Sequence, residues 1–79
     1  MSSPSIHLAP RQLQLARLVS AWLRNKEIAH QLNLTEGTVR VYISTLFHTV
    51  GGNMNRAALA AWYVRNEPEL LAAEQAKKR

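Results

Sequence analysis

Two short apolar-periodic segments, separated by residues 33–35, constrain the fold of this chain more than any other feature. The first segment, residues 25–32, places Ile28, Ala29 and Leu32 on one helical face. The second, residues 36–50, places apolar residues on one face at spacings of four, three and four: Val39, Ile43, Leu46 and Val50. The intervening residues are too few for independent structure and too many for one straight helix. Two helices joined by so short a turn must cross steeply, which is the geometry of a helix-turn-helix.

The residues around this turn suit such a crossing. Ala29 lies where the helices would approach, and a larger side chain there would push them apart. Leu34 can insert between the two helices from the turn. Thr35 is a good N-cap, because its hydroxyl can accept a hydrogen bond from an otherwise unpaired backbone N–H. Glu36 complements the positive end of the helix dipole. In this order and register, the features favour two crossing helices.

The outward face of the second helix decides whether it reads DNA or only packs. At about 100° per residue, the face opposite the apolar stripe carries mainly short, hydrogen-bonding side chains: Gly37, Val41, Ser44, Thr45 and His48, flanked by Arg40 and Tyr42. A solvated surface helix normally carries several Glu and Lys residues at such positions. Val41 would suit a thymine methyl group, and Arg40 could reach guanine or a phosphate. The alternative is that this face is simply a mildly polar solvent face.

Several sequence blocks point to a specific kind of helix-turn-helix. They are Leu8 with Pro10-Arg11, the block NKEIA at residues 25–29, Leu32, the block TEGTVRV at residues 35–41, and NRA at residues 55–57. On these residues the chain resembles the LuxR-type (NarL/FixJ, or GerE-like) helix-turn-helix of bacterial transcription regulators. The resemblance covers residues 8–65 and is much more specific than a generic helix-turn-helix.

The resemblance implies an all-α, four-helix fold, to which this chain adds a C-terminal helix. The first helix is expected from Pro10 to Leu23, with these residues facing inward: Leu15, Leu18, Val19 and Trp22. The helix over residues 25–32 would be the scaffold, and the helix over residues 36–50 would enter the major groove of DNA. The fourth helix would make a dimer contact.

The same resemblance assigns functional residues by position. The base-reading residues of the family fall on Arg40, Val41 and Ser44. The phosphate-facing residues fall near Lys26, Thr38 and Tyr42. Thr45 and His48 share the outward face and are further candidates for phosphate contacts.

The chain also departs from the pattern of the family. Ala9 and Gln12 stand where a Thr and a Glu usually form a capping box, so the first helix is expected to start less firmly. Trp22 replaces the usual Gly that ends this helix. Thr49 stands where the family often has Lys, which leaves the recognition helix less cationic than is typical.

Composition is in keeping with a polyanion as partner. The chain of 79 residues forms one domain and carries 10 Lys and Arg against 5 acidic residues, a formal charge of +5. The C-terminal Lys77, Lys78 and Arg79 supply part of this charge. Within the fold, a modest phosphate footprint remains from seven cations: Arg11, Arg17, Arg24, Lys26, Arg40, Arg56 and Arg65. Basic composition alone is weak evidence.

The chain divides into three parts. Residues 1–7 are expected to form a flexible arm, residues 8–66 the DNA-binding domain, and residues 67–79 a helical extension with a basic tail. Gly51 or Gly52 suits a left-handed end to the recognition helix, and Asn55 is an N-cap for the next helix. The sequence NEPE at residues 66–69 resembles a second helix start, so a last helix is expected over residues 68–77.

The fourth helix is apolar or aromatic throughout residues 57–64, which is more than one buried stripe requires. In one interpretation its alanines pack on the first helix while Trp62 or Tyr63 covers the edge of the core. In the other, a second face forms a two-fold interface from Ala58, Ala61, Tyr63 and Val64. A homodimer through this helix would place two recognition helices on half-sites about one helical turn apart. We expect such a dimer on DNA.

No pattern of catalytic, cofactor-binding or metal-binding residues is evident. His7, His30 and His48 have no metal-ligand spacing, and the absence of cysteine removes disulfides and thiolate metal sites. Gly51-Gly52 follows a helix, whereas a phosphate-binding loop follows a strand. No apolar run reaches the length of a membrane span, and residues 1–7 lack the regions of a signal peptide. We therefore expect a cytoplasmic protein that is not an enzyme.

The sequence predicts a sequence-specific, DNA-binding transcription regulator that consists of the output domain alone. Such regulators usually carry a receiver or ligand-binding domain, so this chain is a stand-alone regulator or an excised fragment. A stand-alone protein would be controlled by abundance, dimerisation or a regulatory protein partner. Two alternatives stay open: a protein-interaction module that keeps the fold without specific DNA reading, such as an antagonist pairing through helix four, and a nonspecific nucleoid-type binder.

Overall fold

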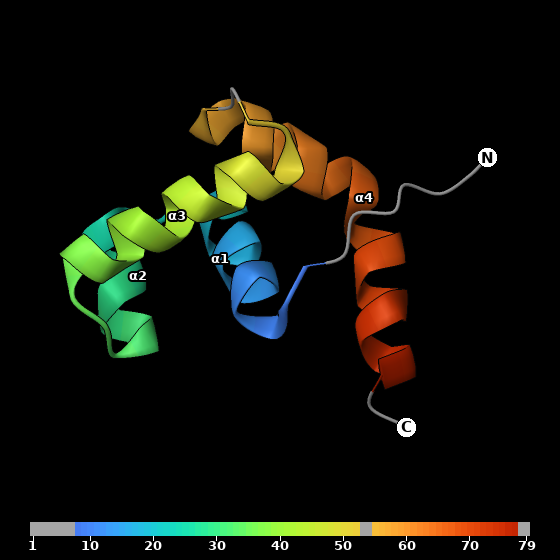
Figure 1. The fold of residues 1–79 in the computed structure, drawn as a ribbon, viewed down its shortest axis with the longest axis horizontal. Coiled ribbons are helices and arrows are strands. Elements are labelled where there is room, and N and C mark those ends of the chain that lie inside the picture. Colours follow the sequence, from blue (N-terminus) through green and yellow to red (C-terminus); the bar gives the residue numbers. More distant parts are fainter. Residues whose placement is uncertain (1–7, 53–54, 78–79) are drawn as a thin grey trace.

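The computed structural model describes residues 8–52 and 55–77, and all regular secondary structure in these ranges is α-helical. The helices are α1 (Pro10–Ser20), α2 (Asn25–Leu32), α3 (Glu36–Val50) and α4 (Arg56–Lys77) (Figure 1). The expected all-α helix-turn-helix class with a C-terminal helix is therefore confirmed. The arm predicted over residues 1–7 and the end of the basic tail, residues 78–79, lie outside the described residues.

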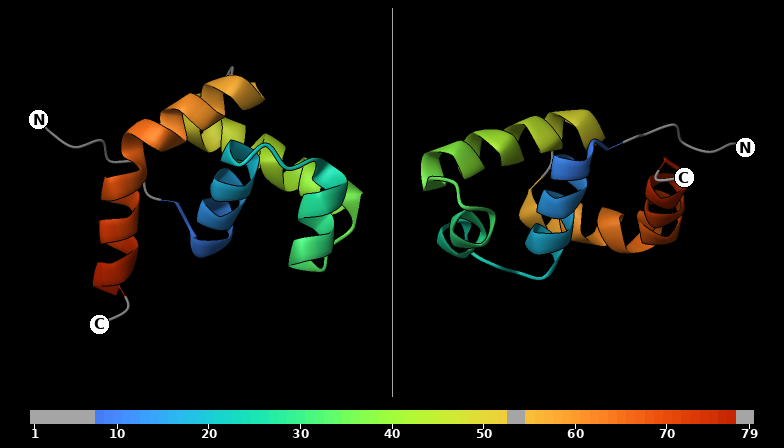
Figure 2. Two further views of the ribbon diagram at one scale, coloured as in Figure 1. Left: turned by 180° about the vertical axis from the view of Figure 1, so that it is seen from behind. Right: turned by 90° about the horizontal axis from the view of Figure 1, so that it is seen from below.

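The turn between α2 and α3 is built by local hydrogen bonds. Asn33 ends α2 in the left-handed conformation, with φ of 60°, and the Leu34 N–H donates to the Ala29 carbonyl over 2.9 Å. The Thr35 hydroxyl then accepts from the Thr38 N–H over 3.1 Å, which confirms Thr35 as the N-cap of α3. The two helices cross steeply, so that α2 is seen almost end-on while α3 runs across the view (Figure 2, right).

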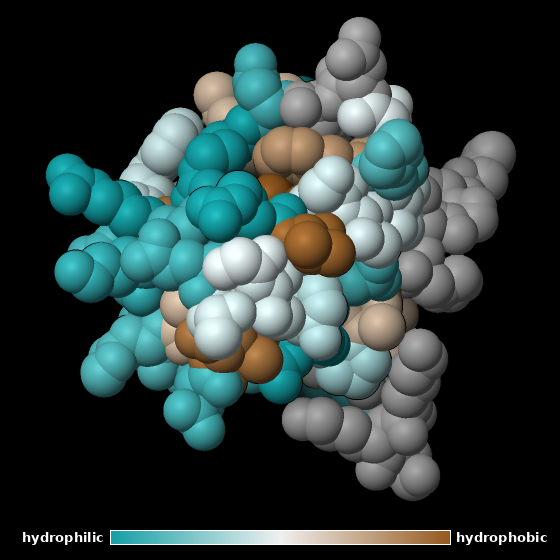
Figure 3. Space-filling model, turned by 60° about the vertical axis from the view of Figure 1, so that its left-hand side comes forward, coloured by the Kyte–Doolittle hydropathy of each residue, from teal (hydrophilic) through white to brown (hydrophobic). Residues whose placement is uncertain are grey.

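The core lies where α1 packs against α3 and α4, and where α2 packs against α3. Its largest fully buried side chains are Leu15, Val19, Ile28, Val39, Leu46 and Leu59. Ala29 is buried at the crossing, and Leu34 packs against the core from the turn, as the sequence predicts. On the face shown in Figure 3, apolar side chains are scattered among polar ones and form no broad patch. Among the described residues, most large apolar side chains lie in the core, and the exposed ones are Trp22, Val41, Tyr42 and Val64.

Trp22 lies differently from the prediction. α1 ends at Ser20, before the expected Leu23, and Trp22 follows in the left-handed conformation with φ of 66°. Its side chain is 65% exposed, so the expected inward orientation is wrong. The physical reason is that the helix has already ended at this residue, and the helical periodicity that placed it inward no longer applies. Trp22 instead adopts the backbone conformation that suits the glycine usual at this position.

Replacing Trp22 by glycine is expected to leave the free energy of unfolding unchanged or to raise it by up to about 1 kcal/mol, because left-handed backbone is strained for a residue with a Cβ. The exposed indole has little burial to lose. Urea denaturation followed by circular dichroism measures the change. Trp22→Val, with a β-branched side chain, is the control and should be less stable than Trp22→Gly. A clear loss of stability in Trp22→Gly would show that the indole supports the fold.

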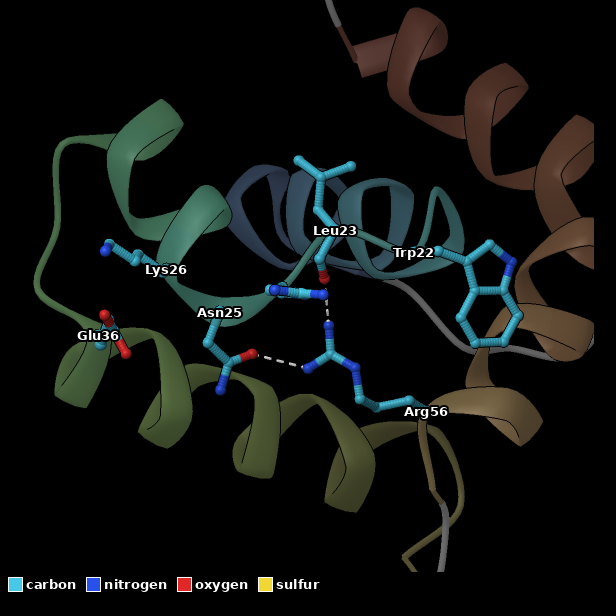
Figure 4. Close-up of a pocket in the computed structure, with 7 residues that line it drawn as sticks. Trp22, Leu23, Asn25, Lys26, Glu36 and Arg56 are labelled. Atoms are coloured by element: carbon cyan, nitrogen blue, oxygen red, sulfur yellow. Dashed lines mark hydrogen bonds between the residues drawn. The ribbon is translucent and has the colours of Figure 1, made fainter.

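Arg56 ties the start of α4 to the turn between α1 and α2 (Figure 4). One guanidinium nitrogen donates to the Asn25 Oδ1 over 2.7 Å, and the other donates to the Leu23 carbonyl over 2.5 Å. Hydrogen bonds from a charged donor are among the stronger ones in proteins. By its charge Arg56 belongs to the expected phosphate footprint, but its donors are directed at these internal acceptors.

α4 is one continuous helix with Pro68 inside it. It begins at the expected N-cap, because the Asn55 Oδ1 accepts from the Ala58 N–H over 2.7 Å. The expected C-terminal helix is present as the second half of α4, which turns away from the first half (Figures 1 and 2). A proline removes one intrahelical hydrogen bond and crowds the preceding turn, which bends a helix. Past the bend, Leu70 is buried in the same core cluster as Leu8.

Candidate nucleic-acid interface

α3 separates into a buried face and an exposed face. Val39, Ile43 and Leu46 are buried, whereas Arg40, Val41 and Ser44 are exposed. The structure therefore brings the predicted base-reading residues together on one accessible surface of two consecutive turns. Val41 is 61% exposed, which is unusual for a valine and leaves its methyl groups free to contact a ligand. We call this exposed side of α3 the recognition face.

The candidates for phosphate contact differ in what their side chains can offer. Lys26, Tyr42 and His48 are exposed. The Thr38 hydroxyl accepts from the Thr35 hydroxyl over 3.0 Å, so its own proton is free to donate to a phosphate. The Thr45 hydroxyl already donates to the Val41 carbonyl over 3.1 Å. Since a phosphate oxygen only accepts, Thr45 would have to give up this bond in order to contact one.

The recognition face is bordered by a different helix on each side. Glu36, one turn before Arg40 on the same side of α3, lines a hollow together with Asn25 and Lys26 of α2. On the opposite side, α3 and the start of α1 form a second hollow, lined by Arg11, Gln12, Leu15, Val41, Tyr42 and Thr45. We call the second one the α1–α3 hollow. A ligand on the recognition face thus meets α2 along one edge and α1 along the other.

Gln12 fastens the start of α1 to α3. Its Oε1 accepts from the Ala9 N–H over 3.0 Å, which supplies one half of a capping box although Ala9 has no side-chain acceptor. Its Nε2 donates to the Thr49 hydroxyl over 3.2 Å, and that hydroxyl donates to the Thr45 carbonyl over 3.0 Å. Two positions that depart from the family pattern, 12 and 49, therefore contact each other. Sequence reasoning missed this link because the two residues are far apart along the chain.

Three of the four residues predicted for the dimer surface of α4 are exposed, and the fourth is buried. Ala58, Ala61 and Val64 are exposed, with Val64 at 68%. Tyr63 is only 3% exposed. Its hydroxyl accepts from the Arg17 Nε over 3.4 Å and donates to the Glu67 Oε2 over 3.1 Å. Burial raises the pKa of Tyr63 above its usual value; the hydrogen bond from Arg17 opposes this shift and the one to Glu67 reinforces it. Tyr63 is a core residue that joins α4 to α1, and it is not available to a second molecule.

The described part of the chain gives little support to a metal site or a membrane-spanning helix. There, no three His, Cys, Asp or Glu side chains are placed to hold a metal ion together. His30 and His48 are both exposed on their helices. In the same residues, no helix is long and apolar enough to cross a membrane. The recognition face, with a hollow on each side, is therefore the candidate functional site.

Comparison with known proteins places the chain among bacterial regulators. A family model described as "Bacterial regulatory proteins, luxR family" matches residues 7–60. The two-component response regulator PprB of Pseudomonas aeruginosa is 45% identical over 53 residues, which are 67% of this chain and 19% of that protein. The probable HTH-type transcriptional regulator GfsR of Streptomyces halstedii is 34% identical over 61 residues, 77% of this chain and 25% of that protein. The chain thus spans a quarter or less of the length of these relatives. No solved structure matches it.

Proposed function

The chain belongs to the LuxR family of bacterial regulatory proteins, and from that premise we propose that it is a sequence-specific DNA-binding transcription regulator. The observation that carries the proposal is the division of α3 into a buried apolar face and an exposed, acid-poor recognition face. The family is a class of DNA-binding regulators, and the proposal includes no catalytic step and no cofactor. The relatives are named as a two-component response regulator and a probable HTH-type transcriptional regulator.

In this proposal α3 lies in the major groove of B-DNA, which is wide enough to admit an α-helix. Arg40 donates to the acceptor edge of a guanine or to a phosphate, Val41 contacts a thymine methyl group, and Ser44 bonds to a neighbouring base edge. These three side chains are exposed on consecutive turns of α3. Val41 and Ser44 are short, so the helix must approach the bases closely, and Gly37, which is exposed and has no side chain, leaves room for this approach.

Phosphate contacts would fix the position of α3 in the groove without reading sequence. Lys26 supplies an ammonium group on the α2 side. Thr38, Tyr42 and His48 supply neutral donors or an imidazole on α3 itself. The Thr45 hydroxyl contributes only if it releases the Val41 carbonyl. All five are proposed phosphate contacts, and Thr45 is the weakest of them because its hydroxyl already donates to the Val41 carbonyl.

We also propose that the protein binds DNA as a homodimer through α4, using Ala58, Ala61 and Val64. These residues are exposed and small or apolar, and an isologous contact would bring the same patch of two protomers together. Two recognition helices would then address half-sites about 34 Å apart. In the relatives the matching segment occupies a quarter or less of the protein. A chain made of this segment alone would need another means of control, and we propose dimerisation or a regulatory protein partner. Its place of action is the cytoplasm, where bacterial DNA is found.

Replacing Arg40 by alanine is expected to cost about 1–3 kcal/mol of specific binding and to relax the preference at one base pair. Arg40 is exposed, so the fold should not change. Binding to the preferred duplex and to single-base variants, measured by fluorescence anisotropy, gives both quantities. Arg65→Ala, which removes the same charge from an exposed position of α4, is the matched control. An unchanged base preference in Arg40→Ala would remove Arg40 from the base-reading set.

The proposed function is tested by selecting binding sites from a random duplex library, together with sedimentation with and without DNA. A short, roughly palindromic motif bound by two protomers supports the proposal. Affinity that falls steeply with salt but depends little on sequence indicates a nonspecific binder. If no motif is recovered and the protein captures another regulator, it is an interaction module and the DNA-reading proposal is wrong.

A further inference from the structure

We propose that the α1–α3 hollow is a binding site for the DNA backbone, in which Arg11 holds a phosphate on the side of α3 away from Lys26. This inference rests on the proposed function, because it assumes that α3 lies in a DNA groove. It adds to that function a contact from a helix outside the helix-turn-helix. The sequence counts Arg11 and Arg17 toward a phosphate footprint by their charge alone, and the residues it assigns to particular contacts lie on α2, α3 and α4.

The position of the hollow is the first reason. Two of its lining residues, Val41 and Thr45, belong to the recognition face, and Arg11 and Leu15 of α1 lie across from them. Leu15 is only 1% exposed and forms the floor. DNA bound on the recognition face must therefore pass over this hollow. An apolar floor with a cation and a phenol at its sides suits a deoxyribose and its adjoining phosphate.

Charge is the second reason. A helix in the major groove lies between two sugar-phosphate chains, and favourable binding places cations near both. On the α2 side of α3 the chain offers Lys26 and Arg40. On the α1 side the exposed residues of α3 are neutral: Tyr42, Thr45 and Thr49. Arg11 supplies the only positive charge among the residues that line the α1–α3 hollow.

The free guanidinium of Arg11 is the third reason. Arg11 is exposed and makes no hydrogen bond or ion pair with any other residue in the described ranges. This distinguishes it from Arg17 and Arg56, whose guanidinium groups are hydrogen-bonded within the fold. A guanidinium presents a planar fork of donors that matches two phosphate oxygens. Arg11 can therefore bind a phosphate without breaking a contact to any residue of 8–52 or 55–77.

The neighbouring residues hold this cation in place. Pro10 begins α1, and Gln12 links the start of α1 to the Ala9 N–H and to Thr49 of α3. The backbone of Arg11 is thus fixed relative to the recognition helix before DNA binds. Because less freedom is lost on binding, a contact from such a fixed segment is worth more than one from a loose arm.

The test compares Arg11→Gln with the wild-type chain on duplex DNA across a range of salt concentrations. Loss of one phosphate contact per protomer should reduce the slope of log K against log salt by about 1 per protomer and weaken binding roughly uniformly across sequences. We expect an affinity loss on the order of tenfold at low salt. Gln75→Glu, an equal change of net charge at an exposed position of α4, should leave the slope unchanged. Arg11→Lys, which keeps the charge, should retain most of the affinity.

Single methylphosphonate substitutions then locate the contact. Each removes one phosphate charge, and one of them should weaken the wild-type protein but not Arg11→Gln. The inference is overturned if Arg11→Gln keeps the wild-type salt slope and the same sensitivity at every phosphate, and the proposed function still stands in that case. If the wild-type chain does not bind duplex DNA, both fail, and the first titration shows this before any variant is compared. A wild-type chain that binds without sequence preference overturns specific reading alone, because the salt slope on mixed-sequence DNA still tests Arg11.

Discussion

Replacing Arg56 by alanine is expected to lower the free energy of unfolding by about 3 kcal/mol, because hydrogen bonds from a charged group contribute about 1.5–3 kcal/mol each. The guanidinium of Arg56 donates to Asn25 Oδ1 over 2.7 Å and to the Leu23 carbonyl over 2.5 Å. Both acceptors lie at the α1–α2 turn, and the alanine would leave them without this partner. A domain of this size has a total stability of about 5–15 kcal/mol, so the loss would be a large part of it.

Urea denaturation measured by circular dichroism gives the loss directly. Arg56→Lys keeps the charge but cannot reproduce the planar fork, so its stability should lie between wild type and Arg56→Ala. Arg65→Ala alters an exposed arginine of the same helix and should change stability by no more than about 0.5 kcal/mol. If Arg56→Ala is as stable as Arg65→Ala, the two hydrogen bonds are not important for the fold.

DNA binding by Arg56→Ala shows whether Arg56 has only a structural role or also contacts DNA. Because the donors of Arg56 are directed inward, the salt slope of DNA binding should stay at the wild-type value in Arg56→Ala when measured well below its unfolding midpoint. A reduced slope would mean that Arg56 also neutralises a phosphate, as the count of basic residues first suggested.

The helix-turn-helix could be predicted because its signals are local. The apolar spacing on both sides of the turn identifies the buried faces, and the caps Thr35 and Asn55 bond to residues three positions away. Exposure of Arg40, Val41 and Ser44 follows from the same spacing. Their roles in DNA reading remain predictions, since a helical face shows what is accessible and not what binds there.

Other features depend on contacts that sequence spacing does not encode. The partners of Arg56 are 31 and 33 residues away, and the Gln12–Thr49 bond joins residues 37 apart. The sequence leaves Tyr63 either at the edge of the core or in the dimer surface, because the first turns of α4 are apolar on every side and periodicity cannot tell which side meets α1. Trp22 was misplaced because the helix ends just before it. Except at Trp22, where the local end of α1 decides, the deciding contact belongs to the tertiary structure.

The largest loss of DNA affinity is expected from Val41→Glu. Val41 is 61% exposed at the centre of the recognition face, so the substitution should change the free energy of unfolding by no more than about 0.5 kcal/mol. In the complex, the new carboxylate would face base edges and phosphates, and juxtaposed like charges cost several kcal/mol. The contact with a thymine methyl group would also be lost. Together these effects should weaken binding by about 100-fold or more, which is about 3 kcal/mol.

Val64→Glu provides a matched control, because it introduces the same side chain at a valine of α4 that is 68% exposed. On a duplex with a single half-site, Val64→Glu should bind like the wild-type chain, whereas Val41→Glu should not. On a full palindromic site, Val64→Glu should lose cooperativity if α4 forms the dimer contact. Equal losses for the two variants on the half-site would point to a general charge effect. Wild-type affinity in Val41→Glu would mean that α3 is not the helix that enters the groove, because no close approach to the bases could tolerate that carboxylate.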